Sequence, residues 1–184
     1  MTLLRLLVPA VCLVFAAPAT AAVTVFGTSS ARLCYEAAEF GTGAAAGIQA
    51  CDRALAEEAL VREERVATFV NRGILKLRGG RVDVAIADFD EAMKTDASEP
   101  EAHLNKGMAL LRLGGRADEA VALFDAALGH KTRRPALAHY GRAIAHEAAG
   151  RVSDAWRDYR QASLLEPAWS DPKTELARFT VRRR

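Results

Sequence analysis

One apolar pattern recurs three times in the chain, as Ala85-Ile86…Phe89…Ala92-Met93, Ala120-Val121…Phe124…Ala127-Leu128 and Ala155-Trp156…Tyr159…Ala162-Ser163. Each copy begins 35 positions after the one before it, and a glycine precedes each copy, at Gly80, Gly115 and Gly150. Repeats of this length are typical of helical solenoids, in which each unit packs mainly against its neighbours. The pattern therefore predicts an all-α solenoid, a class of fold that commonly serves as a binding scaffold.

The spacing inside each copy predicts an α-helix with one buried face. Residues at offsets 0, 1, 4, 7 and 8 share a face because the helix has about 3.6 residues per turn. The alanines let neighbouring helices approach, and the aromatic residue between them fills the groove, so we interpret these stripes as core and not as a cofactor site. Together with the segment before each stripe, they predict helix pairs at residues 67–78 and 83–95, 101–113 and 117–128, and 136–149 and 152–165.

Two further segments flank the three pairs. The stripe Gly47-Ile48…Cys51…Ala54-Leu55 has the same internal spacing but lies 38 positions upstream (51 to 89), which indicates a divergent first repeat with a long connection through Arg65. Asp171-Pro172 is an N-cap followed by proline and predicts a helix that caps the last repeat. The predicted units are a first repeat at 28–65, three regular repeats at 66–99, 100–134 and 135–168, and a capping helix at 170–181.

Residues 1–22 have the pattern of a secretion signal. Arg5 precedes an apolar stretch from Leu6 to Ala17, and Ala19-Thr20-Ala21 has the small residues that signal peptidase accepts. The apolar stretch is too short for a comfortable transmembrane helix, although an uncleaved anchor or a buried helix is the alternative. We expect a periplasmic or secreted protein with no stable membrane insertion after cleavage. Its net charge of +2 gives no electrostatic case for nucleic acid as a partner.

The repeats resemble those of the tetratricopeptide-repeat family. The resemblance rests on three sets of residues, namely Asn71-Arg72-Gly73, Gly80-Arg81, Ala85 to Ala92 and Asp96; Asn105-Lys106-Gly107, Gly114-Gly115-Arg116, Glu119-Ala120, Phe124 and Ala127; and Ala143, Gly150-Arg151, Asp154-Ala155, Tyr159, Ala162 and Glu166-Pro167. It implies a right-handed superhelical solenoid of antiparallel helix pairs, with about four repeats and a capping helix. With the signal sequence, the chain is similar to small exported bacterial proteins of this family. The proline that usually ends a repeat is replaced by Ala97 in one copy and by Thr132 in another.

The resemblance also implies a concave groove lined by the first helices of successive pairs. The residues expected there are Val70, Asn71, Ile74, Arg78, Leu104, Asn105, Met108, Arg112, Tyr140 and Ile144. The amides of Asn71 and Asn105 would bind the backbone of an extended peptide, and Arg78 and Arg112 would meet its carboxylates. The alternative is that these residues only pack neighbouring helices or face solvent.

Two cysteines remain once the signal sequence, with Cys12, is removed. Cys51 has the aromatic position of the first stripe, and Cys34 has the small-residue position of the helix that faces it. In an oxidising compartment, two cysteines on closely packed facing helices are expected to form a disulfide. A redox pair or a metal site is the alternative, but the chain has no CxxC motif.

The sequence carries no recognisable catalytic motif. It lacks HExxH, GxSxG and a phosphate-binding glycine loop, and His139 and His146 lie two helical turns apart, too far for a close zinc-binding pair. We therefore expect no enzyme activity, no cofactor and no metal site. Two hypotheses follow: a scaffold that holds a peptide or partner protein in the groove, or a structural helper of the cell envelope that self-associates through its convex face or termini.

Overall fold

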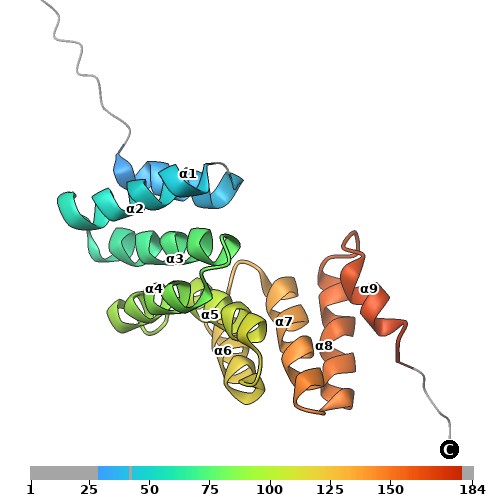
Figure 1. Cartoon of the computed structure of the whole chain (residues 1–184). Helices are drawn as coiled ribbons and strands as arrows, with labels where there is room; N and C mark the ends of the chain where they lie inside the picture. Colours follow the sequence, from blue (N-terminus) through green and yellow to red (C-terminus); the bar gives the residue numbers. More distant parts are fainter. Residues whose placement is uncertain (1–28, 42, 180–184) are drawn as a thin grey trace, which may run out of the picture.

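The computed structural model describes residues 29–41 and 43–179, and every regular element in these ranges is a helix (Figure 1). The predicted signal sequence lies outside the described residues. The helices are α1 Ser30–Phe40, α2 Ala44–Glu57, α3 Arg62–Arg78, α4 Val82–Thr95, α5 Pro100–Leu113, α6 Ala117–Gly129, α7 Pro135–Ala148, α8 Val152–Leu165 and α9 Asp171–Leu176. They form four consecutive pairs followed by a short last helix, which confirms the predicted all-α solenoid.

The pairs stack side by side in chain order (Figure 1). Each helix packs most extensively against the other member of its pair, and the second helix of one pair packs against the first helix of the next. The first helices also contact one another, α1 with α3, α3 with α5 and α5 with α7. The first helices therefore form an inner layer, and the second helices α2, α4, α6 and α8 cover it on the outside.

Buried aromatic side chains hold the pairs together. Phe89 and Phe124 are fully buried, and glycines of the facing helices leave room for their rings. A Cβ atom added at Gly73 would lie 2.4 Å from Cε1 of Phe89, and one added at Gly141 would lie 2.5 Å from Cζ of Phe124. Phe124 also fills the space beside Gly107. Because Gly107 is in α5 and Gly141 is in α7, this one ring joins two successive repeats.

A repeated ion pair links each repeat to the next. The aspartate directly after the aromatic position of an outer helix contacts a basic residue of the following inner helix. The pairs are Asp52 with Arg72, Asp90 with Lys106, and Asp125 with Arg142. Each aspartate is about half exposed, so each pair contributes little to stability.

Two of these basic residues also bind a buried aspartate within their own pair of helices. Arg72 donates to Asp88, which also contacts Nζ of Lys76 at 2.7 Å. In the last repeat, Nη2 of Arg142 and Nδ1 of His139 lie 2.7 and 2.8 Å from Oδ1 of Asp158. His139, for which the sequence predicts no role in a zinc site, thus belongs to a buried polar cluster.

The Asp158 cluster predicts a loss of stability in acid. Burial alone would raise the pKa of Asp158, but hydrogen bonds from His139 and Arg142 outweigh it and lower this pKa to about 2. Because the pKa is lower in the folded chain than in the unfolded chain, the carboxylate stabilises the fold above about pH 4. This contribution, roughly 2 kcal/mol, is lost as the pH falls from about 4 to 2. The free energy of unfolding, measured with urea, should therefore decrease more steeply over this pH range in the wild type than in Asp158→Asn.

The control is Asp125→Asn, which changes a more exposed partner of Arg142. Equal pH dependence of the unfolding free energy in the wild type and in Asp158→Asn would contradict the role of Asp158.

The structure corrects two predicted boundaries. Helix α3 begins at Arg62 and not near Ala67, so the connection after the first repeat is shorter than predicted. The first residues of α3 are polar, so the apolar pattern does not reveal them. They suit a helix N-terminus, because Glu63 and Glu64 interact favourably with the positive end of the helix dipole. A side-chain oxygen of Glu64 also accepts a hydrogen bond from the backbone nitrogen of Val61. Helix α9 ends at Leu176, and Phe179 beyond it still packs on the core that contains Tyr159.

The first repeat is joined by the disulfide that the sequence predicts. Cys34 in α1 and Cys51 in α2 are bonded, their Cα atoms are 4.8 Å apart, and both residues are fully buried. The carboxylate of Glu58 adds a second connection, because it accepts from the backbone nitrogens of Ser30 and Ala31 at the start of α1. Helix α1 is thus fixed at its N-terminus as well as at its centre.

Candidate binding groove

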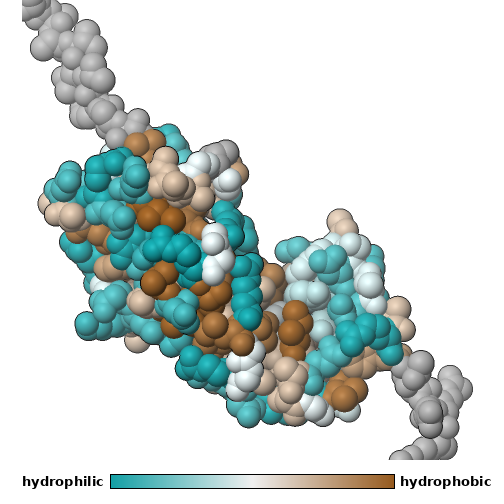
Figure 2. Space-filling view, in the orientation of Figure 1, coloured by the Kyte–Doolittle hydropathy of each residue, from teal (hydrophilic) through white to brown (hydrophobic). Residues whose placement is uncertain are grey.

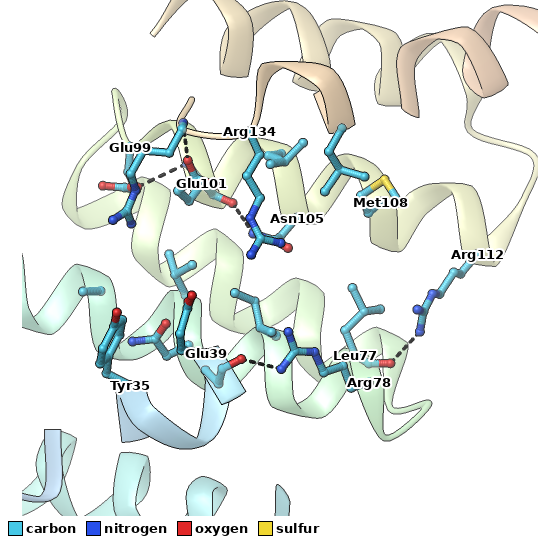
Figure 3. A pocket seen from close by; sticks show the side chains of 18 residues that line it. Tyr35, Glu39, Leu77, Arg78, Glu99, Glu101, Asn105, Met108, Arg112 and Arg134 are labelled. Carbon is cyan, nitrogen blue, oxygen red and sulfur yellow. Dashed lines mark hydrogen bonds between the residues drawn. The ribbon is translucent and has the colours of Figure 1, made fainter. Parts of the chain in front are cut away.

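An open groove of about 470 Å³ lies along the inner layer of helices. Its walls come from α1, α3, α5, the segment before α7 and the first turn of α7 (Figure 3). Eight of the ten residues predicted for a concave groove line it, namely Val70, Asn71, Ile74, Arg78, Leu104, Asn105, Met108 and Arg112. The inner layer therefore brings together side chains that are far apart in the sequence.

Tyr140 and Ile144, the two remaining predicted residues, do not line this groove. Both pack against the core cluster of Tyr159 in the last repeat. The ring of Tyr140 lies edge-on to Tyr159, with centroids 5.6 Å apart, and 4.7 Å from the ring centroid of Trp169. The segment between α8 and α9 thus covers this part of α7, a contact that the period of the repeats does not reveal.

The floor of the groove is apolar. Val70 and Leu104 are buried beneath it, whereas Ile74, Met108 and Leu137 are partly exposed. Figure 2 shows hydrophobic surface gathered over the middle of the molecule, between more polar ends. Such a floor suits apolar side chains of a ligand, and the thioether of Met108 adapts to different shapes.

Several polar residues of the groove are engaged in the fold itself. Arg78 donates to the backbone oxygen of Ala38 in α1, and Nη1 of Arg112 donates to that of Leu77 in α3 at 2.7 Å (Figure 3). Each arginine therefore holds the end of the neighbouring inner helix, where carbonyl groups lack partners within the helix. Their predicted role toward a ligand carboxylate would be additional to this structural one.

The two asparagines differ although their positions are equivalent. Nδ2 of Asn105 donates to the backbone oxygen of Glu101, at 2.8 Å, one turn earlier in α5. The side chain of Asn71, which lines the groove, forms no hydrogen bond to the part of the chain that the structure describes. Asn71 is thus better placed than Asn105 to bind a peptide backbone.

The groove also contains residues that the sequence reading missed. Tyr35 and Glu39 come from α1 of the divergent repeat, and Arg133 and Arg134 come from the segment before α7. Figure 3 shows Arg134 pointing into the groove toward Asn105, on the wall opposite Glu39. A signal for the two arginines existed in the sequence, since Arg133-Arg134 directly precedes a proline that starts a helix.

A buried carboxylate positions these arginines. Glu101 is 9% exposed, and its Oε1 accepts from Oγ1 of Thr132 and from the backbone nitrogen of Arg133, both at 2.8 Å. Thr132 has the position where the family usually has proline. The departure from the family pattern therefore has a function in the structure, because the hydroxyl and the carboxylate together hold the segment that carries Arg133 and Arg134.

The described residues bear on two other kinds of site, a group of metal ligands and a membrane-spanning helix. Within them, no three or more histidine, cysteine or acidic side chains come together as metal ligands would. None of the helices described is both long and apolar enough to cross a membrane. The candidate site is the groove on the inner layer, because the inner helices bring its lining residues together.

Comparison with known proteins agrees with this architecture. The family model described as tetratricopeptide repeat matches residues 70–135 and 114–172, which together span more than half of the chain. None of the curated protein sequences matches the chain significantly.

Several solved structures share the fold. MamA 41-end from Desulfovibrio magneticus RS-1 is 17% identical, with a TM-score of 0.65 over 81% of this chain and 82% of that one. YrrB, a tetratricopeptide-repeat protein with an unusual peptide-binding site, is 18% identical, with a TM-score of 0.62 over 80% of this chain and 74% of that one. The first such domain of Spaghetti (RPAP3), bound to the HSP90 peptide SRMEEVD, is 24% identical, with a TM-score of 0.58 over 64% of this chain and 94% of that one. At these identities the likeness shows the fold alone.

Proposed function

Because the chain belongs to the tetratricopeptide-repeat family, we propose that it is a non-catalytic scaffold that holds an extended peptide, or an extended segment of a partner protein, in its groove. One observation carries the proposal: four successive inner helices contribute side chains to a single open groove with an apolar floor and polar walls. The peptide-binding sites of YrrB and of Spaghetti (RPAP3) support it as analogies of fold.

The proposed binding mode follows from the residues of the groove. Apolar side chains of the peptide would contact Ile74 and Met108, and the peptide backbone would pair with the amide of Asn71. The guanidinium of Arg134 would bind a carbonyl or carboxylate of the peptide, since it points into the groove and makes no ion pair with the described residues.

We also propose that the protein acts in the periplasm or outside the cell. The support is the signal-like sequence at residues 1–22 and the buried bond between Cys34 and Cys51, because disulfides persist in oxidising compartments.

Peptide selection tests the groove. A random peptide library displayed on phage is selected against the wild-type protein, and the affinity of the best peptide is measured by fluorescence anisotropy. The double variant Asn71→Ala/Arg134→Ala should bind that peptide at least about tenfold more weakly, because it loses a backbone hydrogen bond and a charge-assisted one.

The matched control places the same kinds of change on the outer layer. Gln49→Ala/Arg160→Ala removes one amide and one guanidinium from exposed positions of α2 and α8, and should leave the affinity unchanged. Equal losses in the two double variants, or selection of no peptide at all, would refute the groove as the binding site.

A second candidate is the structural helper that self-associates. It is favoured by the exposed apolar residues of α1, where Phe40 is 71% and Leu33 41% exposed at one end of the array. Self-association that light scattering detects, and that survives the groove substitutions, would support this candidate in place of the first.

A further inference from the structure

A second hollow, of about 480 Å³, lies next to the groove. It shares Arg134 and Leu137 with the groove, and its other walls are Glu166 and Trp169 from the segment between α8 and α9. A ligand that extends along the groove past α7 would therefore reach this hollow. One wall of the hollow, Trp169, lies beyond the last repeat at 135–168, so the period of the repeats does not predict it.

Trp169 is held in place by its surroundings. Its ring is tilted by 52° against that of Tyr140, which in turn rests on the buried Tyr159. The backbone nitrogen of Trp169 donates to the oxygen of Glu166 at 3.0 Å, and Nζ of Lys173 donates to the oxygen of Pro167 at 2.6 Å. The indole thus forms one wall of the hollow on a turn that is already ordered, and it remains partly exposed.

The hollow is lined by one carboxylate, of Glu166, and one guanidinium, of Arg134. The carboxylate of Glu166 is exposed and forms no ion pair with the part of the chain that the structure describes. Burial raises the pKa of Tyr140, and the carboxylates of Glu175, Asp171 and Glu147 raise it further, while Arg178 pairs with two of these, Glu147 and Glu175. Arg134 is the one basic residue among the four that line the hollow, and its side chain extends toward Asn105 in the neighbouring groove (Figure 3).

We propose that this hollow is a subsite for a lysine or arginine side chain of the peptide held in the groove, and this inference rests on the proposed function. The face of an indole attracts a cation, and the carboxylate of Glu166 beside it adds a direct electrostatic partner. The peptide would then have a basic residue at the α7 end of the groove. The preference for a basic over a neutral side chain of similar length should be about fivefold, as expected for a partly exposed contact of this kind.

Fluorescence of Trp169 tests the subsite by itself. The chain has two tryptophans, so Trp156→Phe leaves Trp169 as the only one. The emission is titrated with N-acetyl-lysine methylamide and with N-acetyl-norleucine methylamide, which has the same chain without the charge. The lysine compound should half-saturate the change at a concentration at least about threefold lower.

Two further variants test whether Glu166 causes the difference between the lysine and norleucine compounds. Glu166→Gln should remove most of the difference between the compounds, whereas Glu57→Gln, at an exposed position of α2, should leave it intact. Equal titrations by the two compounds, or a difference that persists in Glu166→Gln, would overturn the proposal.

Peptide selection separates this inference from the proposed function. Peptides selected on the wild type should carry lysine or arginine at one fixed position, and those selected on Trp169→Ala should lose that preference but keep the rest of the motif. If the wild type selects peptides without a basic position, the subsite is refuted and the groove stands. If it selects none while the lysine compound still titrates Trp169, the proposed function is refuted and the subsite stands.

Discussion

Replacement of Phe124 by alanine should lower the free energy of unfolding by about 3–5 kcal/mol, the usual cost of removing a fully buried phenylalanine ring. The ring is completely buried and fills the space left by Gly107 of α5 and Gly141 of α7. Its loss would open a cavity between two successive repeats and not within one. Because repeats in a solenoid are stabilised through their neighbours, α7 and α8 should unfold at lower urea concentration than the rest.

Urea denaturation followed by circular dichroism measures this effect. The matched control is Phe40→Ala, since Phe40 is 71% exposed and its truncation should change the stability by no more than about 0.5 kcal/mol. If Phe124→Ala lowered the free energy of unfolding by less than about 1 kcal/mol, the ring would not join the repeats as described.

Removal of the disulfide should cost about 3 kcal/mol, the chain-entropy value for a closed loop of this length. The bond joins residues separated by 17 positions, in a repeat whose buried side chains include the small ones of Ala37, Ala50 and Ala54. The double variant Cys34→Ala/Cys51→Ala should therefore lose helicity and hydrogen-exchange protection in α1 and α2 first. The repeats from α3 onward should keep most of theirs.

Reduction of the wild type provides the control for this variant. Reduced wild type and the double variant should unfold at the same urea concentration, below that of the oxidised protein. Equal stability of the oxidised and reduced protein would contradict this prediction, because the core of the first repeat would then hold α1 and α2 together without the disulfide.

The regular part of the fold follows from the sequence because each of its features has a local cause. The stripes place one apolar face on α4, α6 and α8, and the turns before them at Gly80 and Gly150 adopt the positive φ that glycine favours. Helix α8 has its predicted bounds, α4, α5 and α6 differ from theirs by one residue at one end, and α7 differs by one residue at each end. The aspartates that link the repeats also follow the period of the sequence, because Asp52, Asp90 and Asp125 each come directly after the aromatic position of a stripe.

The parts that the sequence did not reveal depend on contacts between distant residues. The pairing of Glu101 with Thr132 joins positions 31 apart, and Trp169 lies against Tyr140 only because the segment after α8 folds back over α7. The prediction of the groove residues is limited in the same way. The predicted residues of the second and third repeats line the groove, whereas the C-terminal segment covers Tyr140 of the fourth.

NMR can map directly where the bound peptide contacts the protein. The ¹⁵N-labelled wild type is titrated with the best selected peptide, and shifts of backbone amide signals are followed. The proposed groove predicts the largest shifts in α3, α5 and residues 131–137, with little change in the outer helices α4 and α6. Shifts concentrated in the outer helices, or at the exposed end of α1, would contradict it.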